Sequence, residues 1–112
     1  MNLTVRDNPA ASQYEVFDGD RRLGLAQYRR APDRISFIHT EIEPEAQGRG
    51  VASTLIGFAL AEAAEAGLAV LPFCPFVRRY IAERSELLEL VPPDRRAAFG
   101  LESAEEGGTP AS

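Results

Sequence analysis

The segment from Gln47 to Ser53 carries the clearest chemical signal in the sequence, because its residues suit an anion at the start of a helix. It reads Gln47, Gly48, Arg49, Gly50, Val51, Ala52 and Ser53. The first N–H groups of a helix have no internal acceptor, and the peptide dipoles add partial positive charge there. The two glycines allow a sharp turn and a close approach of the backbone to a diphosphate. Arg49 adds a cation and Ser53 a hydroxyl.

Two better-known phosphate-binding loops do not fit this segment. The dinucleotide-binding fingerprint needs a third glycine or alanine where Ser53 stands, and an acidic residue where the apolar run Leu68 to Leu71 stands. The Walker loop needs a Gly-Lys-Ser/Thr sequence, which does not occur. The alternative to an anion site is that Gly48 and Gly50 only form a tight connection between a strand and a helix.

Three further residues have side chains suited to catalysis. Cys74 precedes Pro75 at the start of a predicted helix, a place that favours the nucleophilic thiolate. The alternative is a small apolar core residue. His39 and Glu41 lie two apart on one predicted strand and therefore share a face, where they can act as an acid-base pair. The alternative is a buried histidine with Glu41 as its hydrogen-bond partner.

Three consecutive elements must position these residues. From Ile35 to Glu43, large apolar residues stand at both odd and even positions, and this pattern predicts a central strand covered on both faces. After Pro44, apolar residues three and four apart predict a helix over residues 50–66, closed by Gly67. The run from Leu68 to Leu71 predicts a buried strand parallel to the first, because a strand-helix-strand crossover requires it.

The remaining elements predict an α/β (α+β) fold, in which antiparallel N-terminal strands join the crossover in one mixed sheet. Alternation over residues 2–6 predicts a first strand, and Asp18-Gly19 predicts a hairpin between residues 14 and 28. Pro72 removes a ladder donor, so the parallel strands should begin to part there. Helical spacing predicts a second helix from Pro75 to about Arg84.

Composition limits the domain organisation and the partners. The 112 residues, 45% of them hydrophobic, suffice for one domain, which we place at residues 1–101. Residues 102–112 have almost nothing to bury and predict a disordered tail. We expect a cytoplasmic protein without a membrane or nucleic-acid partner, since no long apolar run, secretory signal or extended basic stretch occurs and the net charge is −5. One cysteine and one histidine cannot supply a structural zinc site, so no metal is expected.

These motifs together resemble the GCN5-related N-acetyltransferase superfamily. The segment Gln47 to Ala52 matches its Gln/Arg-x-x-Gly-x-Gly/Ala signature, after a strand and before an amphipathic helix. The stretches His39-Thr40-Glu41 and Cys74 to Ile81 look more specifically like a subfamily of small single-domain members. The resemblance covers roughly residues 12 to 91. It implies a minimal acyl-CoA N-acyltransferase fold, with acetyl-CoA or coenzyme A as cofactor and an amine as acceptor.

The resemblance also implies roles for particular positions. In that superfamily the two parallel strands splay apart and the pantetheine arm of CoA lies between them. Backbone groups of Ile42 and Glu43 would hold pantetheine, and residues 47–53 the pyrophosphate. Tyr80 stands near the position where many members of the superfamily have a tyrosine that protonates the departing thiolate. Its helical spacing also suits a core residue. The position at which better-known members have a catalytic glutamate falls near Ser36 in this sequence. A serine cannot act as an equivalent base.

We therefore expect an acetyl-CoA-dependent N-acetyltransferase with Cys74, His39, Glu41 and Tyr80 as its catalytic candidates. The acetyl group would pass directly to the amine or through an acetylated Cys74. The alternatives are a non-catalytic acyl-CoA-binding module and a protein-interaction domain. The residues leave open the acceptor and the acyl chain, and we expect a monomer or weak dimer.

Overall fold

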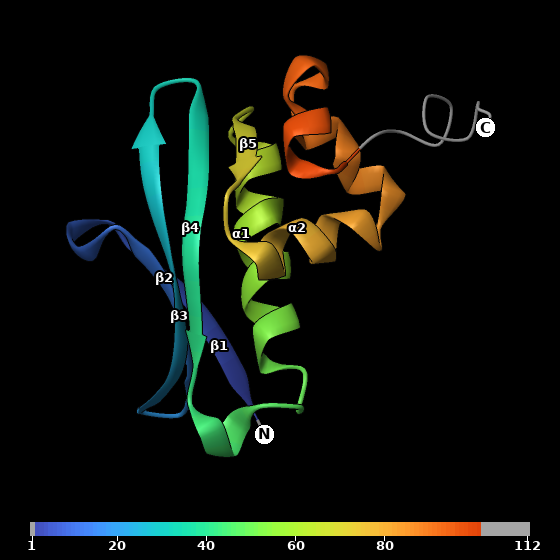
Figure 1. Cartoon of the computed structure of the whole chain (residues 1–112). Coiled ribbons are helices and arrows are strands. Elements are labelled where there is room, and N and C mark those ends of the chain that lie inside the picture. The colour runs from blue at the N-terminus through green and yellow to red at the C-terminus, as the bar shows by residue number, and fades with distance from the viewer. Residues whose placement is uncertain (1, 102–112) are drawn as a thin grey trace.

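The first half of the chain forms an antiparallel sheet in the computed structural model, which describes residues 2–101. Its strands are β1 (Leu3–Asn8), β2 (Gln13–Asp18), β3 (Arg21–Ala31) and β4 (Arg34–Ile42), and they are neighbours in chain order (Figure 1). The predicted hairpin turn is confirmed between β2 and β3, where Gly19 adopts a φ of +62°. The predicted tail, residues 102–112, lies outside the described residues.

A strand-helix-strand crossover completes the sheet. Helix α1 (Val51–Glu65) leads from β4 to β5 (Ala69–Pro72), which pairs with β4 in parallel. The sheet order is β1-β2-β3-β4-β5. The predicted helix and the predicted parallel strand are confirmed, and Gly67 closes the helix with a φ of +71°. This arrangement puts the end of β4 next to the start of α1.

The core lies between one face of the sheet and α1. Apolar side chains of β2, β4 and α1 are almost fully buried there, including Val16, Ile35, Phe37, Leu55 and Ile56. Burying each such side chain stabilises the fold by about 1.5–3 kcal/mol. No helix among the described residues is long and apolar enough to span a membrane.

Two tyrosines at the border of this core donate their hydroxyl hydrogens to carboxylates. Tyr14 donates to Glu62 of α1 at 3.0 Å, and Tyr28 donates to Asp7 of β1 at 2.7 Å. Burial, followed by the hydrogen bond to Glu62, raises the pKa of Tyr14. Burial and the bond to Asp7 raise the pKa of Tyr28 to about 12. Both hydroxyls are therefore neutral donors: that of Tyr14 joins the sheet to α1, and that of Tyr28 joins β3 to β1.

Helix α2 (Pro75–Ala82) crosses α1 at a glycine. A Cβ atom on Gly57 would lie 2.7 Å from the hydroxyl oxygen of Tyr80, so glycine permits this close approach. After α2 the chain continues in 3-10 turns at Ser85–Leu90, Pro93–Arg95 and Ala97–Phe99. The segment around Leu88 is therefore a 3-10 turn.

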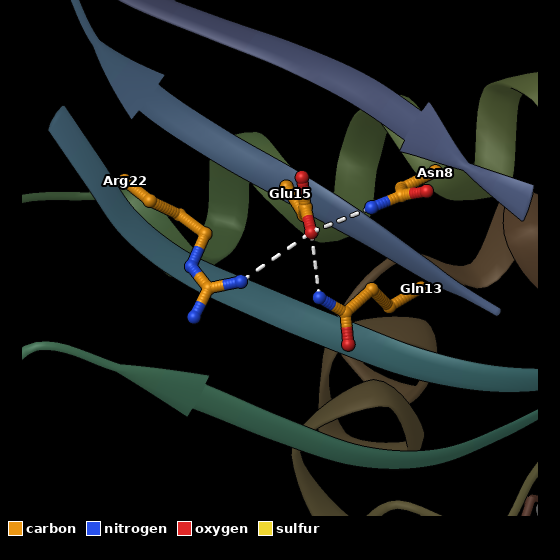
Figure 2. A network of polar contacts seen from close by, with 4 residues as sticks. All are labelled: Asn8, Gln13, Glu15 and Arg22. Atoms are coloured by element: carbon orange, nitrogen blue, oxygen red, sulfur yellow. Dashed lines mark hydrogen bonds and ion pairs between the residues drawn. The ribbon is translucent and has the colours of Figure 1, made fainter. Parts of the chain in front are cut away.

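Within residues 2–101 no helix covers the other face of the sheet, and a polar network lies on it (Figure 2). One carboxylate oxygen of Glu15 accepts hydrogen bonds from Gln13 at 2.6 Å, Asn8 at 3.1 Å and Arg22 at 3.4 Å. Glu15 is 9% exposed. The hydrogen bond from Gln13 is the largest cause that lowers the Glu15 pKa, with Asn8 and Arg22 adding to it against the opposing effect of burial.

The prediction that both faces of β4 are covered is wrong. Ile35 and Phe37 are buried, but Ile38 is 38% exposed and His39 and Glu41 are exposed as well. Apolar residues of both parities occur in β4 because a bulge at Ile38 shifts the alternation. They do not reflect a second protein layer.

Candidate functional site

β4 loses its partner on the β5 side halfway along its length. The parallel register joins Arg34 to Ala69 and ends with Phe37 opposite Pro72. One more hydrogen bond follows, from the Cys74 N–H to the Phe37 carbonyl at 2.9 Å, and the chain then enters α2. Every second residue of a parallel strand donates to its neighbour, and the Ala69 N–H bonds the Asp33 carbonyl of the β4 side at 3.0 Å. The Phe73 N–H, which is next in this alternation after Leu71, donates to the Leu71 carbonyl at 3.1 Å instead, so the regular ladder ends there. The predicted parting of these strands is confirmed, and the second half of β4 has an unpaired edge.

The bulge in β4 decides which side chains face the helices beyond that point. The pairing with β3 shifts between Phe37 and His39, which leaves Ile38 as the additional residue. One extra residue reverses the alternation of side chains between the two faces. Phe37 therefore points to the core, and beyond the bulge Thr40 and Ile42 take that side. His39 points to the open face.

The start of α1 presents backbone N–H groups without a side-chain cap. Gly50 occupies the N-cap position, and no side chain of the described part of the chain caps the helix there. Gly48 and Gly50 have φ angles of +80° and +77°. Residues with a Cβ adopt this left-handed region at a cost of about 1–2 kcal/mol, which glycine avoids. The sharp turn predicted from these glycines is confirmed.

A cavity of about 390 Å³ lies between the unpaired half of β4 and the start of α1. β4 contributes Thr40 and Ile42 to its wall, and α2 contributes Phe76. The connection and the first turn of α1 contribute Ala46, Gln47, Gly48, Gly50, Val51, Ala52 and Ser53. The cavity therefore joins a helix N-terminus, which suits an anion, to a strand edge, which suits an amide-containing chain.

Most of the predicted cofactor-binding residues line this cavity. They are Ile42, Gln47, Gly48, Gly50, Val51, Ala52 and Ser53. Arg49 is exposed and lies outside the lining. Three lining residues were missing from the prediction: Thr40, Ala46 and Phe76. Thr40 was missed because its direction depends on the bulge, which the alternation of residues in β4 does not reveal.

Glu43 lies outside the lining as well. Its N–H donates to the Leu23 carbonyl at 2.8 Å, and its own carbonyl accepts from the Ala46 N–H at 2.9 Å. Successive residues of a strand direct their backbone groups to opposite sides, so those of Ile42 point to the unpaired edge. The Ile42 carbonyl accepts from the Gln47 side chain at 3.2 Å. In this structure Glu43 offers no free N–H to a ligand.

Cys74 lies behind the wall of the cavity. It is the N-cap residue of α2 and is 4% exposed. Its Sγ lies 3.3 Å from the Oγ1 of Thr40, which lines the cavity. Burial agrees with the reading of Cys74 as a core residue, whereas the Thr40 contact leaves it one side chain away from the cavity.

His39 and Glu41 meet on the open face of the sheet. The Nε2 of His39 lies 2.8 Å from a carboxylate oxygen of Glu41. Their side chains are 51% and 62% exposed, so the alternative of a buried histidine is wrong. The predicted pairing of the two side chains is confirmed. They lie beside the cavity along the chain but point away from it.

Tyr80 packs between the two helices and does not line the cavity. Its hydroxyl lies against Gly57 of α1, and the Arg84 guanidinium stacks 3.7 Å above its ring. Tyr80 is only partly buried, at the edge of the core cluster. Its predicted role as an acid stays a prediction.

A comparison with family models identifies the family of this chain. A model described as GCN5-related N-acetyl-transferase matches residues 13–90, which is more than half of the chain. The chain therefore belongs to this family, and its mixed five-stranded sheet has the compact fold of these acyltransferases. Membership indicates acyl-CoA-dependent N-acetyl transfer to an amine as the general activity. A comparison with curated proteins gives no match.

Proposed function

We propose that this protein is an acetyl-CoA-dependent N-acetyltransferase of the small single-domain subfamily. The cavity between the unpaired half of β4 and the uncapped start of α1 is the observation that carries the proposal. It brings together the two groups that a CoA molecule needs, namely amides for its diphosphate and a strand edge for its pantetheine amides. The acceptor is an amine whose identity is open.

The chain's own residues hold the cofactor in this proposal. Backbone N–H groups of residues 48–53 bind the diphosphate, helped by the α1 dipole. The outward backbone groups of Thr40 and Ile42 pair with pantetheine, once the Gln47 side chain shares or releases the Ile42 carbonyl. When bound, acetyl-CoA supplies an activated acetyl thioester.

His39 is the proposed base for the amine. It lies next to Thr40 in the chain but faces the open side of β4, so an acceptor on that side can meet the cofactor across the strand edge. Glu41 fixes the imidazole through the 2.8 Å contact and stabilises it when it takes the proton. Direct attack is favoured over an acetylated Cys74, because this residue is 4% exposed and does not line the cavity.

Thermal unfolding with CoA tests the binding half of the proposal. We expect CoA and acetyl-CoA to raise the unfolding temperature, since a ligand at 100 times its Kd stabilises by about 2.7 kcal/mol. ATP, which carries phosphates but no pantetheine, is the control and should stabilise much less. Absence of any shift with CoA would contradict the proposal and favour the alternative function of a protein-interaction domain.

A second candidate is a binding module without turnover. The observation in its favour is that Cys74, His39, Glu41 and Tyr80 all lie outside the cavity lining. Release of the CoA thiol from acetyl-CoA in the presence of a panel of amines separates the two. Turnover that His39→Ala lowers by about 10²–10⁴-fold, the range for a positioned base, supports the enzyme. Binding without turnover on every amine supports the module.

The covalent route has its own measurement. Intact mass after incubation with acetyl-CoA would reveal an added acetyl group, formed as the Cys74 sulfur displaces the CoA thiol. Cys74→Ala is the matched control. We expect no stable adduct in either protein, and an adduct lost in the variant would replace direct attack by the acetyl-cysteine route.

A further inference from the structure

The cavity has two chemically different ends. At one end the connection and the first turn of α1 supply backbone amides and Ser53. The other end lies where β4 and β5 part, and its wall contains Phe76 of α2 and Thr40 of β4. A ligand with its diphosphate at the first end therefore extends its far end toward Thr40.

The hydroxyl of Thr40 has a buried partner on one side only. Its Oγ1 lies 3.3 Å from the Cys74 Sγ, and the sulfur is held in place because the Cys74 N–H bonds the Phe37 carbonyl at 2.9 Å. A thiol has one hydrogen to donate, and a hydroxyl has one donor and two acceptor sites. When Cys74 donates to Thr40, the Thr40 O–H is free to donate into the cavity.

Local structure explains why a hydroxyl reaches this position. Without the bulge at Ile38, His39 would point to the helix side and Thr40 to the open face. The partner of Thr40 on β3 is Ala26, which is 1% exposed and too small to cover the hydroxyl. The bulge and a small neighbour therefore keep Thr40 directed into the cavity.

We propose that Thr40 is the hydrogen-bond donor to the sulfur of the acyl-CoA, and that Cys74 is a positioning residue that directs its hydroxyl. This inference rests on the proposed function. As the amine forms the new C–N bond and the C–S bond breaks, the sulfur leaves with the electron pair and the amine proton passes to His39. Thr40 keeps its own proton and stabilises the negative charge on the sulfur by donating to it.

Binding of two ligands to three proteins tests this without an acceptor. The ligands are CoA and desulfo-CoA, which lacks the thiol, and the proteins are the wild type, Thr40→Val and Thr40→Ser. Valine has the shape of threonine without the hydroxyl. We expect Thr40→Val to lose about 3- to 10-fold in CoA affinity, the effect of one hydrogen bond, and to bind desulfo-CoA as the wild type does. Serine should restore CoA binding.

Cys74→Ala supplies the second variant. With Thr40 in place, Cys74→Ala should lower the preference for CoA over desulfo-CoA. In the Thr40→Val background it should have no further effect on this preference, because the two residues act through one hydroxyl. Circular dichroism spectra and unfolding temperatures check that each variant is folded.

The outcomes separate this inference from the proposed function. If the wild type binds neither ligand, both fail. If the wild type binds both ligands and Thr40→Val weakens them equally, or leaves both unchanged, the CoA site stands and the role of Thr40 is overturned. A serine variant that behaves like valine also overturns it.

Discussion

The polar groups on the two faces of the sheet differ in whether they have hydrogen-bond partners. On the open face, Glu15 accepts three hydrogen bonds on one oxygen and is almost buried (Figure 2). On the helix side, the first turn of α1 has no side-chain cap and half of β4 has an unpaired edge, and both border a cavity. Buried polar groups normally have partners. A network with its partners in place therefore serves stability, while the uncapped groups around the cavity are open to the ligand that we propose.

The largest effect is expected at Gly50 on the cavity side. Gly50→Val should lower CoA affinity by about 100-fold or more, because the side chain meets the ligand and the left-handed backbone resists a Cβ. Gly67→Val is the matched control, since Gly67 has nearly the same φ, +71° against +77°, but does not line this cavity. Calorimetric titration of both variants with CoA gives the comparison. Equal affinity in the two variants would mean that the diphosphate does not bind at this loop.

The opposite result is expected at Glu15 on the open face. Glu15→Gln should lower the free energy of unfolding by about 1–3 kcal/mol, since charge-assisted hydrogen bonds are replaced by weaker ones in a nearly buried place. Its CoA affinity should be unchanged. Denaturant unfolding measures the first value, and Glu65→Gln, an exposed site at the end of α1, is the control with an expected change within about 0.5 kcal/mol. A loss of CoA binding in Glu15→Gln would mean that the two faces are coupled.

The pH dependence of stability sharpens the same contrast. The network lowers the pKa of Glu15 in the folded protein, first through the Gln13 hydrogen bond. Its stabilising contribution is therefore fully present above the unfolded-state pKa of about 4.3 and is lost as the pH falls through the lower folded-state pKa. Unfolding measured from pH 7 to pH 3 should show a difference between wild type and Glu15→Gln that shrinks with acid. A constant difference would mean that the charge of Glu15 does not contribute.

The smallest effect is expected at Arg49. This side chain is exposed and lies outside the cavity lining, so its attraction to a phosphate is screened by water and salt. Arg49→Ala should weaken CoA binding about 3-fold at low salt and less at high salt. Arg29→Ala on β3, also exposed, is the control for general charge. A loss as large as that of Gly50→Val would place Arg49 in direct contact with the ligand.

The sequence by itself determined the crossover and the turn that begins α1. Apolar spacing defined the helix, and the demands of a parallel crossover defined β5. Gly48 and Gly50 were predicted to form the sharp turn, and their positive φ angles agree. These features depend on residues close together in the chain, so local patterns are sufficient to predict them.

Only the tertiary structure decided which side chains of β4 face the cavity. The bulge at Ile38 depends on how β4 pairs with β3, a contact between segments that the alternation pattern of β4 does not record. It moved His39 and Glu41 to the open face and directed Thr40 to the cavity. In the same way, the pairing of Glu43 with Leu23 occupied an amide that the sequence had assigned to a ligand. Register is a property of two strands together, and one extra residue in either strand reverses every side chain beyond it.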